Sequence, residues 1–315
     1  MKCDSGSMLV SVFRHSPLAL VLAFTTAASG CGGDDDDGAA DGDGDSGSGP
    51  DGSTGRSTEY VANSAGLIAL TEGQASWLVG TQRLHARLAD ALEVPPASLL
   101  DSSGECEVWV HPGPALCDPS CNLGACVAED QCASYPNPVS AGDIVVSGLL
   151  EPLSFVPGEF GYSPDREFSE DLFADGAAIT ASAPGGDAPG FSLEVTGVAP
   201  IEADLDLESG GILRIEDGVD EVVRWTAEAS GRIQLVLVVG HHGSSYEALL
   251  VCETADDGEL VVPGDLITRF PRQASDLQSH TSWLARFSRD VVDTDTGPIE
   301  LIVSSTAIIY AVAHD

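Results

Sequence analysis

The stretch RIQLVLVVGHHGSSYEALLVCET, residues 232–254, decides the fold class of this chain. Aliphatic and β-branched side chains dominate residues 232–239 and again residues 246–254, and polar positions alternate with apolar ones at the start of the first run. Glycines at positions 240 and 243 separate the two runs. This pattern predicts two β-strands joined by a loop as a hairpin.

Segments of the same kind recur on both sides of this hairpin. Alternation bounded by Gly, Pro or Asp predicts further strands at residues 66–71, 82–88, 107–111, 143–149, 178–183, 191–198, 211–216, 221–228, 282–290 and 299–311. A single helical turn is expected after Pro263. Many short strands without long helices predict an all-β fold, an antiparallel β-sandwich of jelly-roll-like or Ig-like type.

The sandwich is expected to occupy residues 57–315 as one domain. A cysteine-rich insertion covers residues 106–132, and the break Pro136-Asn137-Pro138 marks the best sub-boundary, near residues 136–140. The hydrophobic content of 43% is that of a chain which can bury a sizeable core.

Residues 1–30 have the pattern of an export signal. Arg14 and His15 precede a short apolar run at residues 18–24, which is too short to span a bilayer. The segment then ends in Ala28-Ser29-Gly30-Cys31, which resembles the lipobox of bacterial lipoprotein signal peptides. The resemblance implies that Cys31 becomes a lipidated N-terminus, whether translation starts at Met1 or at Met8. Ordinary secretion, with Cys31 as a spare cysteine, is the alternative.

Residues 31–56 contain Gly, Asp and Ser with no aromatic residue and no aliphatic residue larger than alanine. Such a segment cannot bury itself, so we expect a disordered acidic linker that holds the domain away from a membrane. Gly32 follows Cys31, and under the enteric sorting rule this predicts the outer membrane, with the domain facing either the periplasm or the cell surface.

The charge balance restricts the partners. The 315 residues include 50 acidic and 13 basic side chains, for a formal net charge of −37. Because phosphate backbones are bound mainly by Lys and Arg, no nucleic-acid partner is expected. A cationic envelope protein, a neutral glycan or a contact bridged by calcium fits this charge better.

Six cysteines remain once Cys3 is removed with the leader and Cys31 carries lipid. An even number in an exported chain predicts three disulfides, whereas four thiolates within residues 117–132 leave zinc as the competing interpretation. Of the many pairings that six cysteines allow, the spacing favours Cys117–Cys126, Cys121–Cys132 and Cys106–Cys252. We expect the last pair to join two sheets.

A second resemblance covers most of residues 57–315. The segments Cys132-Ala-Ser-Tyr-Pro136 and Ser140-Ala-Gly-Asp-Ile144, a strand with Trp225, and Cys252 followed by Asp256-Asp-Gly258 are similar to uncharacterised surface lipoproteins of high-GC Gram-negative gliding bacteria. No established activity accompanies that family. The resemblance therefore implies the architecture only.

Candidate binding residues are few. The turn Gly240-His-His-Gly-Ser-Ser245 could hold a metal or a nucleophile, but a plain hairpin loop is the preferred interpretation. Asp293 and Asp295, and the acidic turn at residues 216–221, are candidates for calcium, with solvated turns as the alternative. Core packing is preferred over sugar stacking for the four tryptophans, Trp77, Trp109, Trp225 and Trp283. No other cofactor is expected.

No catalytic residue can be assigned from these patterns. The sequence therefore favours a membrane-anchored, non-catalytic binding or structural module that contacts an envelope protein or a glycan. The alternative is a secreted hydrolase of glycosidase type, whose paired carboxylates are hidden among the many acidic residues.

Overall fold

The computed structural model describes residues 64–73, 84–92, 98–110, 118, 120–121, 124–159, 161–166, 171–228, 231–240, 246–272 and 282–314. The regular secondary structure of these residues is almost entirely β-strand, as the alternation predicts. Within them, no helix has the length and apolar character needed to span a bilayer. The leader and the linker at residues 1–56 lie outside the described residues.

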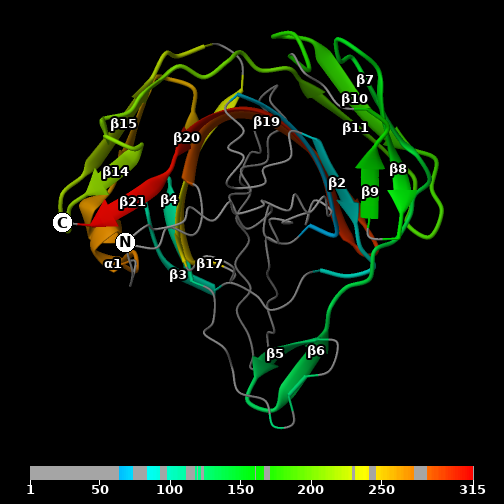
Figure 1. Cartoon of the computed structure of the whole chain (residues 1–315), viewed down its shortest axis with the longest axis horizontal. Helices are drawn as coiled ribbons and strands as arrows, with labels where there is room; N and C mark the ends of the chain where they lie inside the picture. Colours follow the sequence, from blue (N-terminus) through cyan, green and yellow to red (C-terminus); the bar gives the residue numbers. More distant parts are fainter. Residues whose placement is uncertain are drawn as a thin grey trace, which may run out of the picture.

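An eight-stranded sheet is the centre of the fold. Figure 1 shows it as an arch, with smaller sheets on its outer side. Its strands, from one edge to the other, are β2 (Leu84–Leu88), β1 (Gly66–Gly73), β20 (Gly297–Ile309), β19 (Ser282–Thr294), β16 (Arg232–Gly240), β17 (Tyr246–Ala255), β4 (Cys106–Val110) and β3 (Ser98–Ser103).

A five-stranded sheet covers one flank of the arch (Figure 1). It consists of β11 (Phe191–Thr196), β10 (Ala178–Ala183), β7 (Ile144–Ser147), β8 (Leu153–Gly158) and β9 (Gly161–Pro164). Alternate side chains of this sheet, among them Phe155 and Leu193, pack against Ile68, Leu70 and Leu301 of the arch. Burying a side chain of this size stabilises a fold by about 2 kcal/mol, so this first core attaches the five-stranded sheet firmly.

Two three-stranded sheets and a short helix cover the other flank. One sheet contains β12 (Ala203–Asp204), β15 (Glu221–Trp225) and β18 (Glu259–Val262), and the other β13 (Leu207–Glu208), β14 (Ile212–Ile215) and β21 (Ala311–His314). The helix α1 (Gly264–Arg269) follows Pro263, as predicted. A second core joins these elements to β16, β17, β4 and β19.

The structure contains several strands that the sequence patterns miss. Strands β8 and β9 include Pro157 and Pro164, and proline reads as a strand breaker in a sequence. The pairings β1–β20 and β14–β21 are parallel, whereas an antiparallel sandwich was expected. The two partners of each parallel pair lie far apart in the chain, so no hairpin turn constrains their relative direction.

Two predicted disulfides are present among the described cysteines. Cys121 bonds Cys132 beside the hairpin of β5 (Gly124–Ala128) and β6 (Gln131–Ser134), and Cys106 bonds Cys252. Cys126 is also disulfide-bonded, and its predicted partner Cys117 lies outside the described residues.

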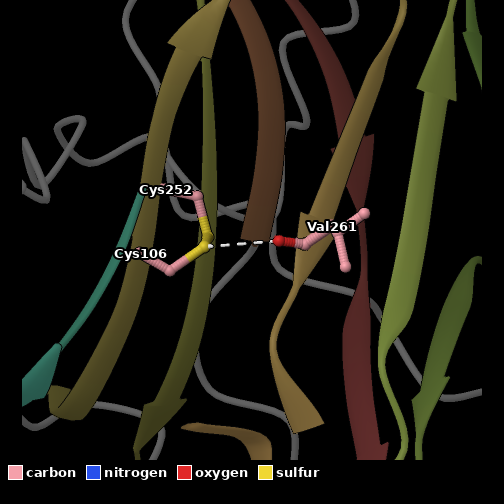
Figure 2. The surroundings of a disulfide bond; sticks show 3 residues. All are labelled: Cys106, Cys252 and Val261. Atoms are coloured by element: carbon pink, nitrogen blue, oxygen red, sulfur yellow. Dashed lines mark hydrogen bonds between the residues drawn. A yellow bond between two sulfur atoms is a disulfide. The ribbon is translucent and has the colours of Figure 1, made fainter. Parts of the chain in front are cut away.

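The Cys106–Cys252 bond was expected to join two sheets, and that detail is wrong. The two residues lie directly opposite each other on the adjacent strands β4 and β17 of one sheet. Figure 2 shows the bond facing β18, with Cys106 Sγ 4.0 Å from the carbonyl oxygen of Val261. Because a disulfide sulfur carries no proton, this approach is a packing contact within the second core.

A buried guanidinium joins the layers. Arg286 on β19 has no exposed side-chain surface, and its Nε donates to Asp256 Oδ2 at 2.7 Å. Its Nη1 donates to the carbonyl oxygens of Ala199 and Pro200, and its Nη2 to that of Thr226 and to Asp256 Oδ1. All five N–H groups of the guanidinium are thus satisfied.

The variant Asp256→Asn tests this arrangement. It leaves the buried charge of Arg286 without a counter-charge, so we expect the free energy of unfolding in urea to fall by about 3–5 kcal/mol. The matched control is Arg224→Gln, which breaks an exposed ion pair with Glu259 and is expected to cost less than about 1 kcal/mol. Equal losses in the two variants would contradict the role given to Arg286.

Candidate functional site

The inner face of the arch is free of both cores. On β19, Leu284 and Arg286 point to the outer layers, so alternation directs Trp283, Phe287 and Arg289 to the other side. On every strand of the eight-stranded sheet, side chains likewise alternate between the outer layers and the inner face. We call this surface the concave face, and Figure 1 shows it as the inside of the arch.

One part of the concave face is apolar. Val236, Val238, Leu249 and Val251 form a small buried cluster, against which Trp109 and Trp283 pack while half-buried. Trp109 Nε1 donates to Glu107 Oε2 at 3.0 Å, which fixes the orientation of its indole ring. Trp225, in contrast, is buried in the second core, as the sequence predicts.

A polar cluster lies beside this patch, on three adjacent strands. Glu253 on β17 accepts one hydrogen bond from Gln234 Nε2 at 2.9 Å and one from Arg289 Nη2 at 3.1 Å. The Arg289 guanidinium lies over the ring of Phe287, 5.3 Å from its centroid. Both charged side chains are nearly buried, with 11% exposure for Arg289 and 5% for Glu253. Each oxygen of the Glu253 carboxylate is therefore partnered.

Glu300 on β20 is a second carboxyl group at this cluster. It has no exposed surface, and neither of its carboxyl oxygens has a hydrogen-bond partner. It sits diagonally across the sheet from Arg289, which pairs with Ile302 two residues further along β20. Burial raises the pKa of Glu300 to about 7, and the carboxylate of Glu253 adds to this while Arg289 opposes it.

His85 and Arg87 complete the polar side of the concave face, on the edge strand β2. Arg87 lies in the same row as Glu300, with Leu67 of β1 between them. Burial, and then the charge of Arg87, lower the pKa of His85 to about 4, so this imidazole is neutral at physiological pH. Burial also lowers the pKa of Arg87.

The residues that the sequence singles out do not gather at one place. Asp293 is near the end of β19 and Asp295 is in the turn to β20, and no three His, Cys, Asp or Glu side chains in the described part of the chain are grouped to hold a metal ion. In the acidic turn, Asp217 pairs with Arg272, and Asp220 accepts from the backbone N–H of Gly264. Cys31, Trp77, and the turn with His241 and His242 lie outside the described residues.

Sequence reasoning missed the cluster of Glu253, Arg289 and Glu300. A signal was present, since Glu253 follows the apolar run at residues 248–252 and Glu300 interrupts the run at residues 299–303. Glutamate is almost never buried unless it is paired, so a glutamate inside an apolar strand is informative.

Comparisons with known proteins identify no relative. No protein-family model matches the chain, and searches of the curated proteins and of the solved structures found no significant match. The geometry of the concave face is therefore the basis on which a function can be proposed.

The carboxyl of Glu300 predicts a pH dependence of stability. The pKa of Glu300 is about 7 in the folded chain and 4.5 in the unfolded chain. The contribution of this carboxyl to the free energy of unfolding is therefore full below pH 4.5 and is lost as the pH rises to about 7. The loss amounts to about 3 kcal/mol, because each pKa unit corresponds to about 1.4 kcal/mol.

Urea unfolding between about pH 4.5 and 8 measures this effect. We expect Glu300→Gln to remove this part of the pH dependence, since glutamine cannot ionise. The exposed Glu194→Gln, which makes the same chemical change on β11, is expected to leave it in place. If wild type and Glu300→Gln lose stability in parallel, Glu300 does not titrate as described.

Proposed function

We propose that this chain is a lipoprotein anchored in the bacterial outer membrane through Cys31. The linker at residues 31–56 acts as a tether, and the β-domain is a non-catalytic module that binds an envelope protein or a glycan. The lipobox-like segment Ala28-Ser29-Gly30-Cys31 supports the anchor. Two or three acyl chains hold a protein firmly on a membrane, whereas one does not.

The concave face is the proposed ligand-binding surface. The observation that carries this proposal is that half-buried aromatic side chains and a buried polar cluster lie side by side on a curved sheet. Ligand sites are mostly apolar, with a few polar groups that fix the orientation of the ligand. The outer face of the arch carries the two cores and is therefore occupied by packing.

Charge favours a neutral ligand on this face. The net charge of −37 repels anions, and Arg289 disfavours a cation close to the cluster. Hydroxyl groups both donate and accept hydrogen bonds, so a sugar could exchange hydrogen bonds with the half-buried amide of Gln234. Glycans are accordingly our first choice of ligand, ahead of an envelope protein.

A hydrolase is the second candidate, and one observation favours it. Glu300 has a pKa of about 7 and lies close enough to Glu253 for the two carboxyl groups to interact. Glycosidases use one protonated carboxyl as a general acid and a second, ionised carboxylate on the other side of the scissile bond. The complete burial of Glu300 argues against direct access for a substrate, so we place this candidate second.

Replacing the proposed lipid attachment site tests the anchor. We expect Cys31→Ser to move the protein from the membrane fraction to the soluble fraction, because the acyl chains are lost. Cell fractionation followed by a carbonate wash measures this. If the Cys31→Ser protein still sediments with washed membranes, something other than lipid holds it there.

A glycan array tests the binding surface. We expect Trp109→Ala to weaken glycan retention by about five- to thirtyfold, since stacking and apolar contact typically contribute about 1–2 kcal/mol. The matched control is Val156→Ala, an exposed apolar residue on β8 of the five-stranded sheet, which should bind as wild type does. Loss of retention in both variants, or in neither, would contradict the use of the concave face.

Assays of purified protein distinguish the hydrolase from the non-catalytic binding module. Glycosidase substrates are incubated with wild type, Glu253→Gln and Glu300→Gln. Turnover by wild type that disappears in either glutamine variant would replace the binding module by the hydrolase. Retention of a glycan without turnover supports the module.

A further inference from the structure

The hairpin of β5 and β6 stands apart from the rest of the fold. It is a sheet of only two strands, and Figure 1 shows it projecting away from the arch. None of its described residues belongs to a buried hydrophobic cluster. Because a two-stranded hairpin on its own is marginally stable at best, its disulfides rather than buried side chains keep it in shape.

Three disulfide-bonded cysteines lie together at this hairpin. Cys132 on β6 bonds Cys121, which lies shortly before β5, and their Cα atoms are 5.5 Å apart. In the strand register, however, the residue directly opposite Cys132 is Cys126 of β5. Cys126 carries a disulfide bond of its own. Cys132 therefore has a second cysteine beside it in addition to the one that it bonds.

A disulfide between directly opposed cysteines already exists elsewhere in this chain. Cys106 and Cys252 face each other across β4 and β17 in the same way, and they are bonded. Opposed residues of antiparallel strands typically have Cα atoms about 4.5–5.5 Å apart, a separation that a disulfide can bridge. A bond between Cys126 and Cys132 therefore requires no change in the register of the hairpin.

The hairpin disulfide and the core disulfide differ in their access to solvent. Cys132 is exposed and Cys121 is half-buried, whereas Cys106 and Cys252 have exposed fractions of 1% and 0%. Thiol–disulfide exchange requires a thiolate to reach a sulfur of the disulfide. The hairpin disulfide is accessible in the folded protein, and the core disulfide becomes accessible only when the second core opens.

The charge around the hairpin restricts the reacting thiol. Glu129 and Asp130 are exposed at the turn, and Asp130 accepts a hydrogen bond from the backbone N–H of Asp118. The sequence has no Lys or Arg between Arg87 and Arg166. Since these carboxylates repel anions, the reactant that fits is a dithiol without negative charge.

We propose that the β5–β6 hairpin is a thiol–disulfide exchange site, at which a dithiol causes Cys132 to change its partner from Cys121 to Cys126. A thiolate of the dithiol attacks the exposed Cys132 Sγ, and Cys121 leaves as a thiolate. The second thiol of the dithiol then displaces Cys132, and the dithiol departs as a cyclic disulfide.

The released Cys132 thiolate completes the exchange. It attacks Cys126 Sγ, the Cys126–Cys132 bond forms, and the cysteine previously bonded to Cys126 leaves as a thiolate. The dithiol has lost two electrons and two protons, and the protein has gained them as two thiols. The cross-link that joined Cys132 to the segment before β5 now joins β5 to β6. This site is independent of the proposed ligand-binding function, because it lies outside the concave face.

Differential alkylation of the full chain in detergent tests the exchange. The protein is treated with dithiothreitol for increasing times, alkylated and analysed by mass spectrometry. Cleavage at Leu123 and Glu129 places Cys121, Cys126 and Cys132 on separate peptides. We expect a Cys126–Cys132 linked peptide to replace the Cys121–Cys132 one. Reduction of the Cys106–Cys252 disulfide should be slower by about a hundredfold or more.

Two variants examine the change of partner directly. Cys121→Ser leaves Cys132 without its present partner, so the Cys126–Cys132 bond should form even without a reductant. The matched variant Cys126→Ser removes the acceptor, so dithiothreitol should yield Cys121 and Cys132 as free thiols with no cross-strand product. The wild-type time course remains decisive if either variant fails to fold.

A comparison of two dithiols tests the charge preference. Dimercaptosuccinate carries carboxylates, so it should react more slowly than the uncharged dithiothreitol, and added salt should narrow the difference. A rate ratio that salt leaves unchanged would refute this preference.

Three results would overturn the exchange site. The first is a reduced protein in which Cys121 and Cys132 are both free while Cys126 keeps its original bond, which is simple reduction. The second is a free thiol that stays on Cys132 in Cys121→Ser. The third is reduction of the Cys106–Cys252 disulfide as fast as that of the hairpin, which would show that the hairpin does not react separately from the core.

Discussion

The layers of this protein depend on one buried guanidinium. Arg286 comes from the middle of the arch and hydrogen-bonds the Ala199–Pro200 segment, where the chain crosses from the five-stranded sheet to β12. It also holds the backbone of Thr226 after β15 and pairs with Asp256 after β17. Because an unpaired buried charge is very costly, these segments cannot separate from the arch without a large loss of stability.

The position of Arg286 on the outer face has a consequence for function. Side chains alternate along a strand, so the residues that fasten the outer layers leave the opposite face of the same strands outside the two cores. Trp283, Phe287 and Arg289 occupy that face on β19, while Leu284 and Arg286 serve the packing. One strand thereby supports the architecture on one side and the candidate site on the other.

Arg286 and Arg289, both on β19, differ in their charge balance. Arg286 faces one carboxylate, Asp256, whose two oxygens also accept from the Trp225 indole and the Glu228 backbone N–H. Arg289 faces two carboxyl groups, of which only Glu253 is hydrogen-bonded. The balanced pair is a structural fastening, whereas in the unbalanced group burial, and then the charge of Glu253, raise the pKa of Glu300 to about 7. Proteins commonly place such imbalances at functional sites, which is why we locate function on the concave face.

The sequence by itself determined the all-β class, most strand positions, the turn after Pro263 and the pairing of Cys106 with Cys252 and of Cys121 with Cys132. The strands and the turn follow from local periodicity, whereas the spacing only favoured Cys121–Cys132 among many possible pairings, and Cys106–Cys252 was the pair that this choice left over. Only the tertiary structure decided that Cys106 and Cys252 lie in one sheet, that β1 runs parallel to β20, and that Glu253, Arg289 and Glu300 meet. The order of strands in a sheet brings these groups together, and that order is set by long-range packing, which alternation within a single strand does not encode.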